Sequence, residues 1–265
     1  MKTVKIIKTI IKTIIKNILP PILLKIIRNE KKIYTFKEKF KLIEDIKTFE
    51  KKANDYIDND LEDKKSEEFL HPKNIEFDSK YLIAPILASL IKNEISILEY
   101  GGGDNPVFSY IKNATSKNIY SEVIEKESFV KRFINKIPSE FKDNILYLDS
   151  VDKVKLTKFD IIYFGSSIQY SDNHEELLKK MFKLDSKYII ISRTFFNLLN
   201  EDFFVIQNNI PNNIFPYKMI NFEKFIKFMK GNNYDLIFNV NYKPQHFHED
   251  IKELEYKDII FKKEA

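Results

Sequence analysis

Short apolar runs alternate with helical stretches from about residue 94 onward, which is typical of a parallel sheet with helices on both faces. The first run, residues 95–100 (ISILEY), has the length and composition of a buried strand. Six further strands are expected at residues 117–122, 144–148, 159–164, 188–192, 234–240 and 257–262. The pattern predicts an α/β domain over residues 93–265, with a seven-stranded and mostly parallel sheet.

Residues 1–33 follow a different pattern, that of a basic amphipathic helix. Isoleucines recur at helical spacing on one face, with Lys8, Lys12 and Lys16 on the other. The lysines interrupt every apolar run before it reaches the ~20 residues that a membrane span needs. Residues 1–27 therefore fit the surface of an anionic membrane, or packing on the domain or on a second copy of the chain.

Residues 34–92 connect this helix to the α/β domain. Their first part, residues 34–70, carries charge at nearly every second position and has neither Gly nor Pro. Solvated helices, serving as a lead-in or a lid, are the expected structure.

The charge of the chain is concentrated at its N-terminus. Residues 1–33 carry nine cations and one anion, so the formal net charge of +5 leaves −3 for the rest of the chain. A slightly acidic body argues against a nucleic-acid partner. The absence of cysteine excludes thiol chemistry and fits a cytoplasmic location, with peripheral contact at the inner face of the membrane through the basic helix.

Glycine marks the most informative point in the sequence. The chain has only 5 glycines, and Gly101, Gly102 and Gly103 are consecutive. They follow the first predicted strand at once, and Asn105 and Pro106 lead into the next helix. A strand, a glycine turn and a helix in this order offer backbone amides to a nucleotide-like ligand, so a cofactor pocket is expected here.

Polar residues after the other strands complete the predicted pocket. Glu122, with Val123 beside it, follows Gly101 by about 20 residues, which is the spacing of an acid that binds ribose hydroxyls. Glu125 is the second candidate for this role. The remaining candidates for cofactor binding follow three later strand ends: Asp149, Ser150, Gly165, Ser166, Gln169 and Tyr170.

The residues around the turn favour one cofactor. A dinucleotide fingerprint needs a third glycine where this chain has Pro106, so a nicotinamide cofactor is disfavoured. Glu99, which precedes Tyr100 and the glycines, would repel a pyrophosphate but could pair with an ammonium group. This combination points to S-adenosylmethionine.

At these residues the sequence resembles a family of S-adenosylmethionine-dependent methyltransferases encoded among surface-polysaccharide (lipopolysaccharide and capsule) genes. The segments ILEYGGG, YSEV, FDIIYFGSSIQY and IIISRT are similar to the family's motifs, over roughly residues 90–261. The resemblance implies a Rossmann-like class I methyltransferase fold. It also implies methylation of a sugar hydroxyl on a glycan or its precursor.

A hydroxyl acceptor needs a base, and histidine supplies the candidates. His174 follows the fourth strand of the domain, and His246 and His248 lie between the last two. Arg193, after the fifth strand, could clamp a phosphate or carboxylate of the acceptor, or pair with Asp160 or Glu99. No metal ligand set is predicted, although His246 and His248 resemble a two-histidine clamp.

Two other functions remain open at this point. Arg193 and neighbouring lysines would also suit a methyltransferase of a small anionic metabolite. A nucleoside-binding scaffold without catalysis would keep the same fold.

Overall fold

The computed structural model describes residues 35–40, 82–91, 93–103, 105–210, 213–241 and 253–264. The predicted N-terminal helix at residues 1–33 lies outside this part of the chain, as do His246 and His248. Within the described ranges, no helix is long and apolar enough to cross a membrane.

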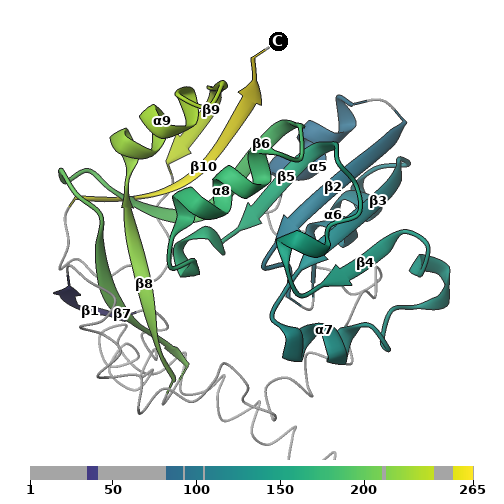
Figure 1. Ribbon diagram of the computed structural model, residues 1–265, viewed down its shortest axis with the longest axis horizontal. Helices are drawn as coiled ribbons and strands as arrows, with labels where there is room; N and C mark the ends of the chain where they lie inside the picture. The colour runs from purple at the N-terminus through teal and green to yellow at the C-terminus, as the bar shows by residue number, and fades with distance from the viewer. Residues whose placement is uncertain are drawn as a thin grey trace, which may run out of the picture.

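Seven strands form the central sheet, in the order β4–β3–β2–β5–β6–β10–β9 (Figure 1). Neighbours from β4 to β6 pair in parallel, whereas β10 is antiparallel to both β6 and β9. Their bounds are β2 Glu94–Tyr100, β3 Asn118–Ile124, β4 Ile145–Leu148, β5 Phe159–Gly165, β6 Ser186–Asn197, β9 Tyr234–Asn241 and β10 Leu254–Lys263. The predicted Rossmann-like fold with a mostly parallel sheet is confirmed. Three further strands, described below, extend these seven to a ten-stranded sheet within the described residues.

Helices cover both faces of this sheet, because successive strand residues point to opposite sides. Ile97 packs in the core shared with α5 (Ile83–Ser89), α6 (Val107–Ala114) and α7 (Glu127–Phe133). Leu98, the next residue, packs in the core shared with α8 (His174–Phe182) and α9 (Phe222–Lys230). Both cores are apolar, which is why the central strands read as nearly continuous hydrophobic runs.

Asparagine side chains start the two helices of the second face. Asn173 accepts a hydrogen bond from the Glu176 N–H at the start of α8, at 3.2 Å. Asn221 accepts one from the Lys224 N–H at the start of α9, at 2.8 Å. Each cap satisfies a backbone donor that the first helical turn leaves open.

The two prolines and the lack of periodicity at residues 210–220 predict a loop from the sequence, but the structure has a hairpin there. Strands β7 (Phe203–Ile210) and β8 (Asn213–Asn221) pair antiparallel, and the end of β8 runs parallel to the end of β6. Figure 1 shows this hairpin standing away from the seven-stranded sheet, beside β1. The loop expectation was wrong because backbone pairing with β7, the strand directly before these residues, does not require the alternation that the sequence lacks here.

The connecting segment also departs from expectation. A solvated helix was expected here, but Thr35–Phe40 form strand β1, which pairs antiparallel with β7. Residues 41–81 lie outside the described chain, so the lid role and the boundary at residue 92 stay predictions.

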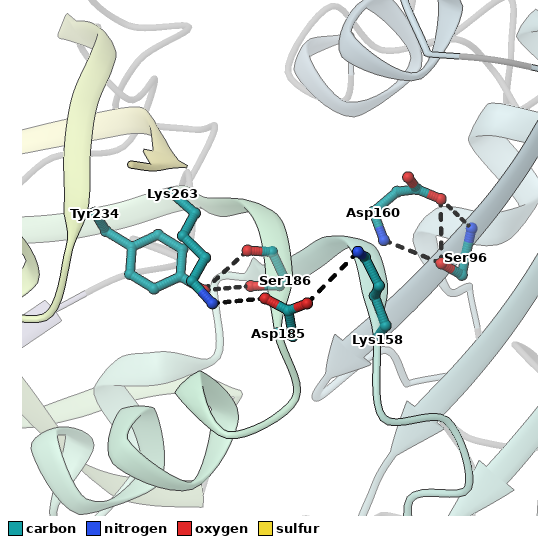
Figure 2. A network of polar contacts seen from close by, with 7 residues as sticks. All are labelled: Ser96, Lys158, Asp160, Asp185, Ser186, Tyr234 and Lys263. Carbon is teal, nitrogen blue, oxygen red and sulfur yellow. Dashed lines mark hydrogen bonds and ion pairs between the residues drawn. The ribbon is translucent and has the colours of Figure 1, made fainter. Parts of the chain in front are cut away.

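Polar clusters join the strands at their amino ends (Figure 2). Asp160, the second residue of β5, accepts hydrogen bonds from the Ser96 amide and hydroxyl on β2, at 3.0 and 3.1 Å. Asp185, just before β6, pairs with Lys263 of β10 at 2.6 Å and with Lys158 at 3.6 Å. Asp160 is thus committed to the edge opposite the glycine turn, so it is not the ion-pair partner of Arg193 considered above.

Candidate functional site

The glycine turn lies at the carboxyl end of β2, between neighbouring strand ends. We call the carboxyl ends of β2 to β6 the glycine edge. Gly101 and Gly103 have φ of +73° and +58°, a region that residues with a Cβ rarely adopt. A Cβ on Gly102 would lie 2.8 Å from Cγ1 of Val123 and 2.9 Å from Cδ of Glu99. The turn therefore has no room for a side chain at Gly101 or Gly102, whereas Gly103 faces open space and favours glycine only through its positive φ.

Side chains from two other strands hold this turn. The Tyr147 hydroxyl, from β4, donates to the Gly103 carbonyl at 3.1 Å. The Ser167 hydroxyl, after β5, donates to the Tyr100 carbonyl at 2.5 Å. Sequence reasoning missed both residues, because neither belongs to the motif around the glycines and both contacts join segments that are distant in the sequence.

Glu99 lies beneath the turn and is only 3% exposed. Its Oε2 accepts a hydrogen bond from the Val107 N–H, the first amide of α6, at 2.6 Å. Burial raises the pKa of the Glu99 carboxyl to about 8, although the Val107 hydrogen bond and the Arg193 charge act in the opposite direction. An acid held in this way would be ionised readily by a cation arriving beside it.

The two candidate ribose acids occupy different environments. Glu122 is fully buried in β3, and its carboxylate accepts hydrogen bonds from the backbone N–H groups of Lys155 (2.8 Å) and Leu156 (3.2 Å). Glu125 follows the carboxyl end of β3, and its Oε1 accepts from the Gly103 N–H at 2.7 Å. The geometry thus brings Glu125, the second candidate, to the glycine turn and commits Glu122 to the loop before β5.

Asp149 and Ser150 follow β4 at the same edge. Asp149 pairs through Oδ2 with Lys153 at 2.8 Å, while its Oδ1 is buried and has no hydrogen-bond partner among the described residues. Ser150 accepts a hydrogen bond from the Asp152 N–H and starts the short helix η4 (Val151–Lys153). Asp149 therefore keeps one acceptor for a ligand, whereas Ser150 serves local structure.

The end of β5 turns sharply at Gly165 and Ser166. Ser166 has φ of +59°, and its N–H donates to the Ser192 carbonyl at 2.8 Å. Gln169, in η5 (Ile168–Tyr170), is buried and donates to the Ser166 hydroxyl at 3.1 Å. Tyr170 is 45% exposed, and its hydroxyl donates to Gln207 of β7 at 2.7 Å. Tyr170 is thus the residue of this group that a ligand can reach most easily, and the hairpin fixes its position.

His174 does not lie open to a substrate. It is 4% exposed, at the start of α8, and its ring lies 5.9 Å from that of Phe225 of α9. Burial lowers its pKa to about 4, with a smaller contribution from Lys218, so the ring is neutral at pH 7. These surroundings do not support His174 as a general base and fit a histidine of the core.

Arg193 reaches the glycine edge from β6. A Cβ on Gly165 would lie 2.8 Å from Nη2 of Arg193, so the guanidinium passes directly over this glycine. Its charge lowers the pKa of Glu99 on β2, which lies on the other side of β5. Of the four proposed catalytic residues, the structure thus brings Arg193 to the edge, buries His174, and does not describe His246 and His248. The described residues contain no group of three or more acids and histidines that could hold a metal ion.

Solved structures with this fold include several methyltransferases. One, from Methanosarcina mazei and described as an S-adenosylmethionine-dependent methyltransferase, aligns with a TM-score of 0.51 at 10% identity, over 68% of this chain and 97% of its own. A Listeria monocytogenes protein assigned to the same class aligns at 0.50 and 11% identity, over the same shares of the two chains. The MccD protein aligns at 0.51 and 14% identity, over 70% and 97%.

The chain therefore has the fold of class I, S-adenosylmethionine-dependent methyltransferases. No protein-family model matches it, and no curated protein matches it in sequence. The arguments for activity consequently depend on the site itself.

Proposed function

We propose that this protein is an S-adenosylmethionine-dependent methyltransferase that binds its cofactor at the glycine edge. The observation that carries the proposal is the glycine turn between β2 and α6. Ser167 leaves no room for a side chain at Gly101, and Val123 and Glu99 leave none at Gly102. Such a turn allows a ligand to approach the backbone closely. The fold shared with known methyltransferases supports the same conclusion.

The residues at this edge fit the three parts of the cofactor. Glu125, beside Gly103, would accept hydrogen bonds from the ribose hydroxyls. The Oδ1 of Asp149, which is buried and has no hydrogen-bond partner among the described residues, would accept one from the adenine amino group. Glu99 would pair with the ammonium of the methionine part, since that cation would offset the burial of the carboxylate.

The chemistry of methyl transfer asks little of the protein beyond positioning. The cofactor would supply an activated methyl group on a sulfonium: an acceptor oxygen forms a bond to the methyl carbon in line as the C–S bond breaks, and the neutral thioether leaves. The protein has to orient the acceptor and remove its proton. Arg193 would orient an acceptor that carries a phosphate or carboxylate, and His246 and His248 remain the candidate bases.

For the acceptor, we propose a sugar hydroxyl of a cell-surface glycan or its precursor. This proposal is supported by the sequence resemblance described above and by Tyr170, a partly exposed ring held at the glycine edge that could stack on a sugar. A small anionic metabolite is the second candidate, favoured by the position of Arg193.

Titration calorimetry with S-adenosylmethionine and, separately, with NAD tests the cofactor assignment. We expect micromolar binding of S-adenosylmethionine alone, after which nucleotide sugars and glycan fragments would be screened as methyl acceptors. Binding of neither ligand would contradict the proposal and favour a scaffold with the same fold.

The affinity for S-adenosylmethionine is expected to rise with pH up to about 8. The Glu99 carboxyl has a pKa of about 8 in the free protein, and pairing with the ammonium would lower it, so binding below pH 8 releases a proton. The dissociation constant should then fall about tenfold per pH unit between pH 6 and 8 and level off above. Calorimetry across this range measures the slope.

Glu99→Gln is the matched control for this pH dependence. Glutamine keeps an oxygen for the Val107 N–H but does not titrate, so the slope should disappear. A slope that survives in this variant would place the titrating group elsewhere.

We also propose that the N-terminal helix holds the enzyme at an anionic membrane surface, near lipid-linked acceptors. Its lysines would each contribute about 1 kcal/mol beside anionic headgroups. Replacing Lys8, Lys12 and Lys16 by glutamate in the full chain should abolish sedimentation with phosphatidylserine vesicles at low salt. Unchanged sedimentation would contradict the membrane role and leave packing on the domain or on a second copy.

A further inference from the structure

Arg193 has an unusual backbone conformation for a residue inside a strand. Its φ is +55°, a value that is unfavourable for any residue with a Cβ. The register between β6 and β10 shifts at the same point, because Lys257 pairs with Thr194 while Ile259 pairs with Ile191. Ser192 and Arg193 together therefore oppose Asp258, which defines a β-bulge, and the left-handed conformation of Arg193 in it is one that glycine adopts most readily.

Asp258 holds both residues of this bulge. Its Oδ1 accepts hydrogen bonds from the Arg193 N–H at 2.7 Å and from the Ser192 hydroxyl at 2.8 Å. The carboxylate is nearly inaccessible to water, since Asp258 is 7% exposed. Two donors on one buried carboxylate oxygen fix the backbone more firmly than a neutral contact would.

The bulge decides where the Arg193 side chain goes. Its guanidinium crosses β5 at Gly165, where a Cβ would lie 2.8 Å from Nη2 and 2.7 Å from the Tyr163 ring. From there its charge acts on Glu99, beneath the glycine turn. In a regular strand the Arg193 side chain would not cross Gly165 toward Glu99, because successive residues alternate between the two faces of the sheet.

We infer that Asp258 is a positioning residue that holds Arg193 in the left-handed conformation and so directs its guanidinium across Gly165 toward Glu99. Asp258 lies far from Glu99 in the sequence, on a strand that contributes no other residue to the proposed site. This inference rests on the proposed function, because its binding test requires that the protein binds S-adenosylmethionine.

The pH dependence of S-adenosylmethionine binding distinguishes positioning from a direct charge effect. The charged or titratable groups that act on the Glu99 region are Arg193 from β6, Glu125 just after β3 and Tyr163 from β5. Releasing Arg193 removes a nearby cation, which raises the pKa of Glu99. Removing the Asp258 anion without moving Arg193 would have the opposite sign or no effect.

The experiment compares Asp258→Ala with Asp258→Asn by calorimetry between pH 6 and 9. Asparagine keeps an oxygen that can accept both hydrogen bonds, whereas alanine has none. We expect Asp258→Ala to raise the pH midpoint of S-adenosylmethionine binding and to weaken binding about tenfold at pH 7. The affinity of Asp258→Asn should stay within about twofold of the wild type. Arg193→Gln should match Asp258→Ala, and the double variant should show no further loss.

Three results would overturn the inference. Equal effects of the alanine and asparagine variants would show that Asp258 acts by its charge. An unchanged or lowered pH midpoint of binding in Asp258→Ala would show that the position of Arg193 does not depend on Asp258. A further loss in the double variant would show that the two residues act independently.

A second measurement tests the positioning role without the cofactor. Glycine adopts positive φ freely, so Arg193→Gly should raise the urea midpoint of the Asp258→Ala chain, or restore folding if that chain fails to fold. No such rescue would contradict the inference. If the wild type binds no S-adenosylmethionine, the proposed function fails, and the rescue alone decides the role of Asp258.

Discussion

Gly102→Val is expected to abolish measurable binding of S-adenosylmethionine. The new side chain would begin 2.8 Å from Val123 and 2.9 Å from Cδ of Glu99, so the turn must move away from the site that it forms. The displaced backbone should weaken binding at least about a hundredfold, while overpacking lowers the free energy of unfolding by about 1–3 kcal/mol. Calorimetry measures the first effect and urea unfolding the second.

Gly231→Ala serves as the control for this substitution. Gly231 ends α9, and a Cβ there would lie 3.3 Å from the Lys227 carbonyl oxygen, in a helix far from the turn. Alanine at this position should leave cofactor affinity unchanged. Equal affinity in wild type and Gly102→Val would show that the ligand does not use the glycine turn.

Glu125→Ala is expected to weaken binding of S-adenosylmethionine and adenosine strongly. The substitution removes the carboxylate beside Gly103 that we propose as the acceptor for the ribose hydroxyls. Two hydrogen bonds to a charged acceptor would be lost. At about 1.5 kcal/mol or more for each, the loss amounts to roughly a hundredfold in affinity. Titration of both ligands measures it.

Glu122→Ala is the matched comparison for Glu125→Ala. Its main effect should be on the stability of the fold and not on cofactor binding. Removing this buried carboxylate leaves the N–H groups of Lys155 and Leu156 without their acceptor. The free energy of unfolding should fall by about 2–3 kcal/mol, with little change in adenosine affinity of the folded protein. A binding loss confined to Glu122→Ala would restore Glu122 as the ribose acid.

The pair of acids illustrates where sequence reasoning reaches its limit. Spacing alone favoured Glu122, because acids about 20 residues beyond a glycine turn commonly bind ribose. Glu122 lies within β3 and Glu125 directly follows that strand, so the two acids are close together in the sequence. Only the loop at Lys155 and Leu156, which comes much later in the chain, shows that Glu122 is already engaged.

The histidines and the hairpin show the same limit. His174 follows a strand end, where catalytic residues are common, but Phe225 and the core between α8 and α9 enclose it. Residues 210–220 contain prolines and no regular alternation, and the partner strand β7 makes them a hairpin. The core around His174 comes from residues distant in the sequence, whereas β7 directly precedes β8, and the hairpin was missed because no alternation marks its strands.

The sequence by itself determined the seven central strands, the glycine turn at the end of the first and the acid beneath it. These features depend on local patterns, namely apolar runs of strand length and backbone that requires glycine. Tertiary structure alone decided which acid meets the turn, which histidine is buried and why Arg193 reaches the edge. Those outcomes depend on burial and on hydrogen bonds between residues far apart in the chain, such as Asp258 and Arg193. Local sequence patterns cannot predict such contacts.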